Sequence, residues 1–167
     1  MSVMGNRYKY AAGFSLIELM VVVMLIALLA TSVVWADTAL IATTKRSRDS
    51  ERSNDMKSVA LIFERYYRTS PTATGSSYPT TQQITTSVDS LIGNAELLTP
   101  PSLSSPVFLV ASTNKTSQTP TVDQYIYQPF NAYDGICTST PPCVRYVLYY
   151  RTEATDEIVT IDSEHQQ

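Results

Sequence analysis

The segment that decides the fold is FSLIELMVVVMLIALLATSVVWA, residues 14–36, an apolar run interrupted by a single charge, Glu18. As an α-helix it would rise about 1.5 Å per residue and span roughly 35 Å, enough to cross the ~30 Å hydrocarbon core of a bilayer. Trp35 stands near its far end, where an indole ring would lie at the headgroup level. The run therefore predicts a transmembrane helix near the N-terminus.

The helical pattern continues beyond the apolar run. Residues 37–68 contain neither proline nor glycine, and residues 45–55 (KRSRDSERSND) are polar throughout. Apolar side chains then recur at helical spacing and form one stripe: Met56, Val59, Ala60, Phe63 and Tyr67. Glu64 and Arg68 are spaced for an i,i+4 ion pair on this helix. Because proline cannot continue a helix, Pro71 should end it shortly after Arg68.

The rest of the chain predicts a loop followed by a small sheet. Residues 69–106 are rich in Ser, Thr and Pro, and should form a loop with one small helix around residues 90–98. Four strand signals follow, at residues 107–111, 125–130, 144–151 and 157–162. Each element alone would expose an apolar face. We therefore expect an α+β fold, in which a long helix, apolar over 14–36 and amphipathic over 37–68, packs on an antiparallel β-meander within residues 107–167.

The charge balance argues against general binding of nucleic acids. The formal net charge is −3, from 12 Lys+Arg and 15 Asp+Glu. From residue 69 onward the chain has three basic residues, Lys115, Arg145 and Arg151, against nine acidic ones. A field of that sign repels phosphate backbones.

The sequence contains no pattern typical of an enzyme. It has no Ser-His-Asp or Cys-His arrangement and no glycine-rich phosphate loop, with five glycines in all. The one histidine, His165, stands in a polar C-terminal tail and is predicted to be a solvated tail residue. We therefore predict no catalytic residues, no cofactor and no metal site.

The two cysteines, Cys137 and Cys143, are close in sequence and leave three interpretations open: a disulfide, a metal pair or two free thiols. A metal site needs further ligands, and His165 is the only histidine. Paired cysteines indicate an oxidising compartment, which agrees with export.

The residues around the start of the apolar run identify a known pattern. Gly-Phe-Ser-Leu-Ile-Glu, residues 13–18, follows a short leader that contains Arg7 and Lys9. This arrangement resembles the class III signal of type IV prepilins and pseudopilins. The resemblance implies that residues 1–13 are a leader peptide, that a membrane prepilin peptidase cuts after Gly13, and that the new N-terminal Phe14 is methylated.

The resemblance also implies partners, location and a pilin-like fold. Partners would be other pilin subunits and an inner-membrane assembly machinery. The chain would first be a single-pass membrane protein, with its N-terminus cytoplasmic and its C-terminal domain outside, and then part of an extracellular filament. Lys/Arg counting does not favour that orientation, since Lys45, Arg46 and Arg48 follow the apolar run. The hairpin that carries Cys137 and Cys143 resembles a pilin's disulfide-closed region, so a disulfide between them is expected.

Glu18 is expected to act in assembly. An ionised carboxylate at membrane depth costs roughly 2.5–3.5 kcal/mol on insertion scales, so it should have a partner. Cleavage after Gly13 creates a positive amine on Phe14, one helical turn away, and a neighbouring subunit's amine can fill the same role. The alternative is that Glu18 extends to the lipid headgroups.

Three other interpretations of the whole chain are open. It could be a pseudopilin of a type II secretion system rather than a pilus subunit. It could be a signal-anchored binding domain that never polymerises. The apolar run could also be an ordinary signal peptide cut after Ala36, although it is longer than the usual ~7–15 residues of such a segment. That last interpretation requires Asp37 as the mature N-terminus.

Overall fold

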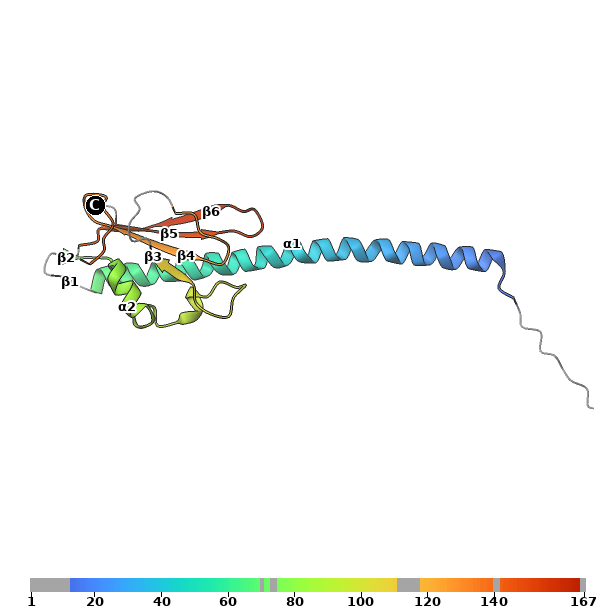
Figure 1. Cartoon of the computed structure of the whole chain (residues 1–167), viewed down its shortest axis with the longest axis horizontal. Helices are drawn as coiled ribbons and strands as arrows, with labels where there is room; N and C mark the ends of the chain where they lie inside the picture. The colour runs from blue at the N-terminus through green and yellow to red at the C-terminus, as the bar shows by residue number, and fades with distance from the viewer. Residues whose placement is uncertain (1–12, 70, 73–74, 111–117, 140–141, 166–167) are drawn as a thin grey trace, which may run out of the picture. The chain divides into compact units, whose positions relative to one another are not determined.

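The computed structural model describes residues 13–69, 71–72, 75–110, 118–139 and 142–165, with the side chains of 32–38, 71–72 and 75 left out. Apart from Gly13, the predicted leader therefore lies outside the described residues, and so does the side chain of Trp35. Figure 1 shows the order of the elements: a long helix, two very short strands, two short helical segments and four further strands. The chain divides into two units, Met1–Ile41 and Ala42–Gln167, which are described separately.

The long helix α1 spans Leu16–Thr69, and residues 42–69 belong to the second unit. It ends where Pro71 predicts its end, because the ring of a proline prevents the next helical turn. In the first unit, every described side chain from residue 14 to 31 is exposed. The exposed fraction of the large apolar ones ranges from 46% at Val22 to 81% at Phe14. Within the described residues, no helix meets the combined length and hydropathy that a membrane crossing requires.

The sheet of the second unit is mixed and has the order β3-β4-β5-β6. Its strands are Phe108–Val110, Tyr125–Phe130, Arg145–Arg151 and Ile158–Asp162. The pairs β4–β5 and β5–β6 are antiparallel, as in the predicted meander, but β3 runs parallel to β4 with Phe108 opposite Tyr125. The prediction of a fully antiparallel sheet is therefore wrong. The connection over residues 111–124 is long enough to return the chain to the same end of the sheet, which a parallel pair requires.

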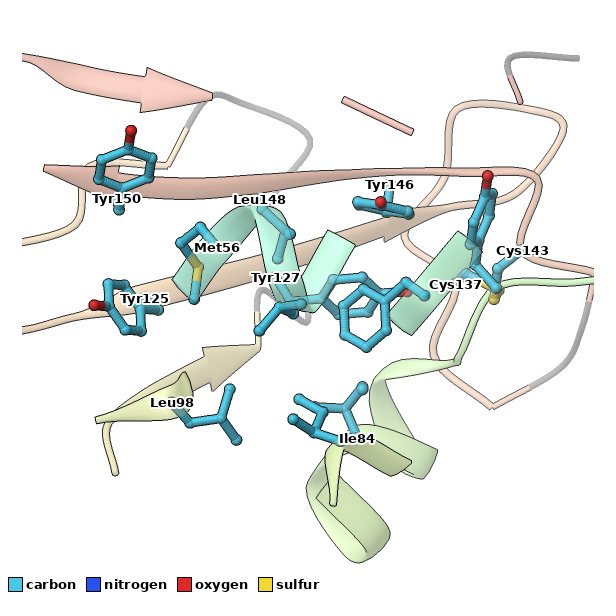
Figure 2. Packing of buried hydrophobic residues seen from close by; sticks show 14 residues of the cluster. Met56, Ile84, Leu98, Tyr125, Tyr127, Cys137, Cys143, Tyr146, Leu148 and Tyr150 are labelled. Atoms are coloured by element: carbon cyan, nitrogen blue, oxygen red, sulfur yellow. A yellow bond between two sulfur atoms is a disulfide. The ribbon is translucent and has the colours of Figure 1, made fainter. Parts of the chain in front are cut away.

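The main core lies between the sheet and the C-terminal part of α1 (Figure 2). Met56, Val59 and Phe63 of α1 are fully buried, as the predicted apolar stripe requires. They pack with alternate residues of β4 and β5, namely Tyr125, Tyr127, Tyr146, Leu148 and Tyr150. The intervening residues form a smaller apolar cluster on the opposite face of the sheet: Ile126, Phe130, Val147 and Tyr149.

Residues 69–106 contain more structure than the predicted loop with one small helix. The strands β1 (Pro71–Thr72) and β2 (Gly75–Ser76) form a two-stranded ladder. Helix α2 spans Thr81–Ile92, and a 3₁₀ turn, η1, spans Ala95–Leu98. The helix starts earlier than predicted because Thr80 and Gln83 form a capping box. It ends at Gly93, whose φ of 72° is a left-handed conformation that glycine adopts without strain.

Candidate functional site

The predicted processing residues lie together at the start of α1. Gly13, Phe14 and Ser15 precede the helix and have no regular secondary structure, and the Ser15 carbonyl accepts the backbone N–H of Leu19 at 3.1 Å. Phe14 is 81% exposed. Glu18 is exposed in the first helical turn, where a carboxylate interacts favourably with the helix dipole. The bond after Gly13 is thus on a non-helical segment that another protein can reach.

Gly13 is not needed by the fold of this chain. A Cβ added at this position would meet no atom within 4 Å. The positive backbone φ that would favour glycine occurs at Gly93 and not at Gly13. The described residues therefore give no packing or backbone reason for a glycine at position 13.

The apolar surface around residues 14–31 is far larger than soluble monomers tolerate. Its side chains point to all sides of the helix, so no single neighbouring face could cover them. Exposed apolar surface of this extent marks a membrane-facing or protein-facing segment. Within the first unit, the described residues leave these apolar side chains uncovered.

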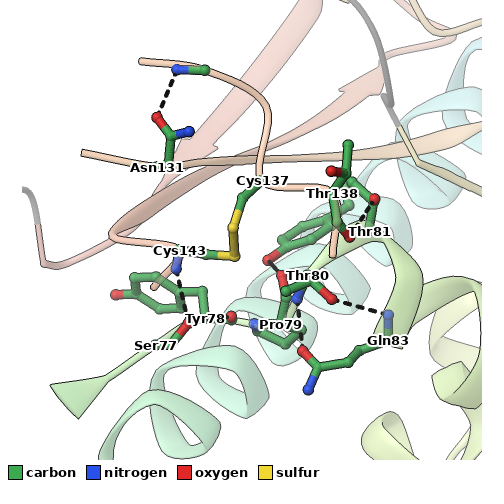
Figure 3. Close-up of a disulfide and its surroundings, with 12 residues drawn as sticks. Ser77, Tyr78, Pro79, Thr80, Thr81, Gln83, Asn131, Cys137, Thr138 and Cys143 are labelled. Carbon is green, nitrogen blue, oxygen red and sulfur yellow. Dashed lines mark hydrogen bonds between the residues drawn. A yellow bond between two sulfur atoms is a disulfide. The ribbon is translucent and has the colours of Figure 1, made fainter. Parts of the chain in front are cut away.

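Cys137 and Cys143 form a disulfide in the structure (Figure 3). Both cysteines are buried, and the bond joins the residues that follow β4 to those that precede β5. Of the three interpretations left open by the sequence, the structure therefore contains the disulfide, and neither of these two cysteines is a free thiol.

The disulfide loop holds the start of α2 in place. The backbone N–H groups of Thr81 and Gln82 donate to the carbonyls of Cys137 and Thr138, at 3.1 and 3.0 Å. These two N–H groups belong to the first helical turn and have no partner inside the helix. On the other arm of the loop, the N–H of Tyr78 donates to the Cys143 carbonyl at 2.9 Å. The loop thus supplies acceptors for two N–H groups of α2 that the capping box of Thr80 and Gln83 leaves without partners.

A buried polar cluster joins α1 to the C-terminal tail, and its centre is Glu64. Its side chain is 3% exposed, and its carboxylate accepts the hydroxyls of Tyr78 and Tyr146 and the backbone N–H of Glu164. The Nδ1 atom of His165 lies 3.0 Å from Glu64 Oε2. We refer to these residues as the Glu64 cluster.

Two sequence predictions are wrong at this cluster. His165 is not a solvated tail residue, since its ring is half-buried and stacks on Tyr67 with the ring centres 4.6 Å apart. The predicted ion pair between Glu64 and Arg68 does not form, because the Glu64 carboxylate turns into the core and Arg68 pairs with Glu164 at 3.4 Å. No local pattern in the sequence signals these contacts.

The cluster keeps its tyrosines protonated. Burial and the nearby Glu64 carboxylate raise the pKa of both Tyr78 and Tyr146 well above the ordinary value. Each hydroxyl therefore stays a hydrogen-bond donor to Glu64 across the physiological pH range.

A second polar cluster fastens the turn between β5 and β6 to α1. Arg48 Nε donates to Glu153 Oε2 at 2.8 Å, and the Asp49 carboxylate accepts the backbone N–H groups of Glu153 and Ala154. The hydrogen bonds from Arg48 lower the pKa of Glu153. Arg52, which is fully buried, bonds to Asp49 and to the carbonyl of Val122. We call these residues the Arg48–Glu153 cluster.

Acidic side chains also meet at a cavity of about 410 Å³ between α1 and η1. Glu51, Asp55 and Glu96 are among its lining residues. Burial, together with the charges of Glu51 and Glu96, raises the pKa of Asp55 to about 6. This cavity therefore disfavours the ionised form of Asp55.

Comparison with known proteins supports the N-terminal assignment. Residues 8–34 match the family model of the prokaryotic N-terminal methylation motif. This class III signal is characteristic of type IV pilins and pseudopilins. The resemblance to that signal, inferred from residues 13–18, is therefore confirmed. The match covers a small part of the chain and leaves the second unit unassigned. No match was found among curated proteins or solved structures.

Proposed function

We propose that this chain is a structural subunit of a type IV pilus-like surface filament, matured by a prepilin peptidase and polymerised through α1. The methylation motif at residues 8–34 is the single observation that carries the proposal. The exposed apolar surface of residues 14–31 supports it, because a subunit of this kind needs a helix that is covered only after insertion or assembly.

The local geometry agrees with proteolytic maturation. A peptidase must bind its substrate in an extended conformation, and residues 13–15 precede the first helical turn. Because the fold itself does not require Gly13, the glycine is best explained by the cleft of the peptidase. Cleavage there leaves Phe14 as the N-terminal residue, and its amine becomes the site of methylation.

The apolar helix would have two successive environments. Before assembly, residues 14–36 lie in the membrane, with the second unit on the outer side. After assembly, the same residues pack against those of neighbouring subunits in the core of the filament. In both states apolar side chains leave water, which favours each state by about 25 cal/mol per Å² of buried surface.

Glu18 would direct assembly by charge. The Phe14 amine of a neighbouring subunit is positive, and a pair with Glu18 in a water-poor core is screened only weakly. An unpaired carboxylate in that core is costly, so subunits should enter in the register that brings amine and carboxylate together.

Mass spectrometry of the mature N-terminus tests the proposal. The expected result is a chain that begins at Phe14 and carries one methyl group on its amine. A chain that keeps residues 1–13, or one that begins at Asp37, would contradict the proposal. Expression in cells that lack the prepilin peptidase provides the control, since there the leader should remain.

The same motif is characteristic of pseudopilins, so a subunit of a type II secretion system is the alternative. Electron microscopy of sheared surface filaments, with mass spectrometry of their subunits, separates the two. A pilus subunit is recovered in long surface filaments, whereas loss of a pseudopilin stops secretion of exported proteins and leaves surface filaments intact.

A further inference from the structure

We propose that the C-terminal tail and α1 together bind a divalent transition-metal ion, best zinc, through Glu64, Glu164 and His165. One ligand atom of each side chain is available, and the three atoms all lie within 4.8 Å of one another. The site is independent of the proposed filament function, because all three residues belong to the second unit.

The donor set selects the class of metal. One imidazole nitrogen and two carboxylate oxygens suit zinc and its neighbours, whereas calcium and magnesium prefer oxygen donors alone. His165 Nδ1 and Glu64 Oε2 are 3.0 Å apart. That distance is close to the separation of two ligands bonded to one zinc ion at about 2.0–2.1 Å.

A buried charge without a strong cationic partner points to a cation here. Glu64 is almost fully buried, and His165 is the one basic side chain that the described residues place within ion-pair distance of it. The other polar contacts of the Glu64 carboxylate are hydroxyl and backbone N–H donors, which carry no net positive charge. A bound ion would supply the missing positive charge.

Glu64 and His165 are also oriented as metal ligands usually are. The hydroxyls of Tyr78 and Tyr146 fix the Glu64 carboxylate, and the ring of Tyr67 fixes the plane of the imidazole. Such supporting contacts around the ligands commonly raise metal affinity, and their loss costs 10–100-fold.

An ion can reach the site from solvent. A cavity of about 290 Å³ borders Glu64 and Glu164, with Lys57 and Asp162 also in its lining. The Glu164 side chain is 62% exposed and pairs with Arg68, so binding would replace an exposed ion pair, which is a weak one. The hydrogen bond between His165 and Glu64 would be replaced by two bonds to the ion. Water from the cavity completes a fourth position.

The experiment is a titration of the purified full-length chain, without a histidine tag and in detergent, with zinc chloride. We expect one zinc ion per chain and a higher melting temperature with zinc than with the chelator EDTA. Cobalt(II) in place of zinc should give the visible absorption of a tetrahedral site. His165→Gln, which can keep a hydrogen bond to Glu64, should lose binding at least tenfold, and Glu164→Gln should do the same.

Glu157→Gln, a change of an exposed acid on the turn between β5 and β6, is the matched control and should bind zinc like the unchanged chain. Circular dichroism must show that each variant is folded. Absence of zinc binding, or equal binding by the folded His165→Gln variant, would overturn the proposal. If the His165→Gln variant binds zinc as well as the unchanged chain does, and the N-terminus is still processed at Gly13, the metal site is wrong. The proposed filament function would then still stand.

Discussion

The hydroxyl of Tyr78 donates to the carboxylate of Glu64, lying 2.9 Å from Oε1 and 2.8 Å from Oε2. The two residues come from different elements, since Glu64 is on α1 and Tyr78 precedes α2. A hydrogen bond to an ionised group is about twice as strong as one between neutral groups. This contact is therefore expected to hold the segment before α2 against α1 more firmly than its neighbours do.

Replacement of Tyr78 by Phe should lower the free energy of unfolding by about 1.5–3 kcal/mol, because it removes a hydrogen bond to a buried charge. Tyr127→Phe is the matched comparison. It removes a hydroxyl that donates to the neutral carbonyl of Pro79 at 2.7 Å and should cost only about 0.5–1.5 kcal/mol. Urea denaturation of both variants measures the difference. A larger loss for Tyr127→Phe would mean that the Glu64 cluster contributes little.

Replacement of Glu18 by Ala should prevent polymerisation without disturbing insertion or the second unit. Loss of the carboxylate leaves the Phe14 amine buried and unpaired in the filament core, at a cost on the order of 3–5 kcal/mol. We expect a many-fold fall of this subunit in sheared filaments, with its amount in the membrane unchanged. Glu18→Gln, which keeps the shape, should fail in the same way. Equal filament yield for both variants would show that Glu18 only extends to the headgroups.

Replacement of both Cys137 and Cys143 by Ser should loosen α2 before it affects the sheet. Closing a loop this small stabilises a protein by about 2 kcal/mol in the chain-entropy description. Hydrogen exchange should accelerate first at the amides of Thr81 and Gln82, whose acceptors lie on the loop. The amides of β5 serve as the internal reference. Alkylation of both thiols in the native, unreduced protein would instead show that the disulfide is absent.

Replacement of Asp55 by Asn should stabilise the chain above pH 6. The pKa of Asp55 is about 6 in the fold and about 3.9 for an unfolded Asp, so the unfolded chain releases its proton first. The free energy of unfolding should therefore fall as pH rises from about 4 to about 6, and stay low above that range. We expect a gain of about 1 kcal/mol for Asp55→Asn at pH 7.5, because solvent screens this partly exposed group.

The gain should vanish at pH 4 and below, where Asp55 is protonated in the fold as well. Asp89→Asn, a change of an exposed acid on α2, provides the control for the loss of one negative charge. A stability difference between Asp55→Asn and the unchanged chain that is constant from pH 4 to pH 8 would exclude this ionisation as its cause.

Local patterns in the sequence predicted the local structure well. The end of α1 follows from Pro71, and β4 has the bounds predicted from its residues, Tyr125–Phe130. In β5, the alternate residues Tyr146, Leu148 and Tyr150 all pack in the main core, as the two-residue period of a strand requires. These features depend on neighbours within a few residues, which the sequence displays directly. The capping box of Thr80 and Gln83 is also local, and could have located the start of α2.

Local sequence patterns could not predict contacts between residues that are far apart in the chain. Glu64 and His165 are 101 positions apart, and nothing near either residue indicates the other. The parallel pairing of β3 depends on the course of a connection whose length allows either direction. The processing motif is a different case, because its residues are identified by their match to a family pattern and are exposed in the structure rather than packed.

The Arg48–Glu153 cluster sets an order of events for a newly made chain. Its partners are 104 and 105 positions apart, and they join the beginning of the second unit to its last hairpin. While the chain is being synthesised, Arg52 has no acid from this hairpin to meet, and Met56, Val59 and Phe63 have no sheet to cover them. The second unit can therefore complete its fold only after nearly all of its residues have left the ribosome. A chain that stalls or is truncated before residue 153 would present an open apolar helix to proteases and chaperones.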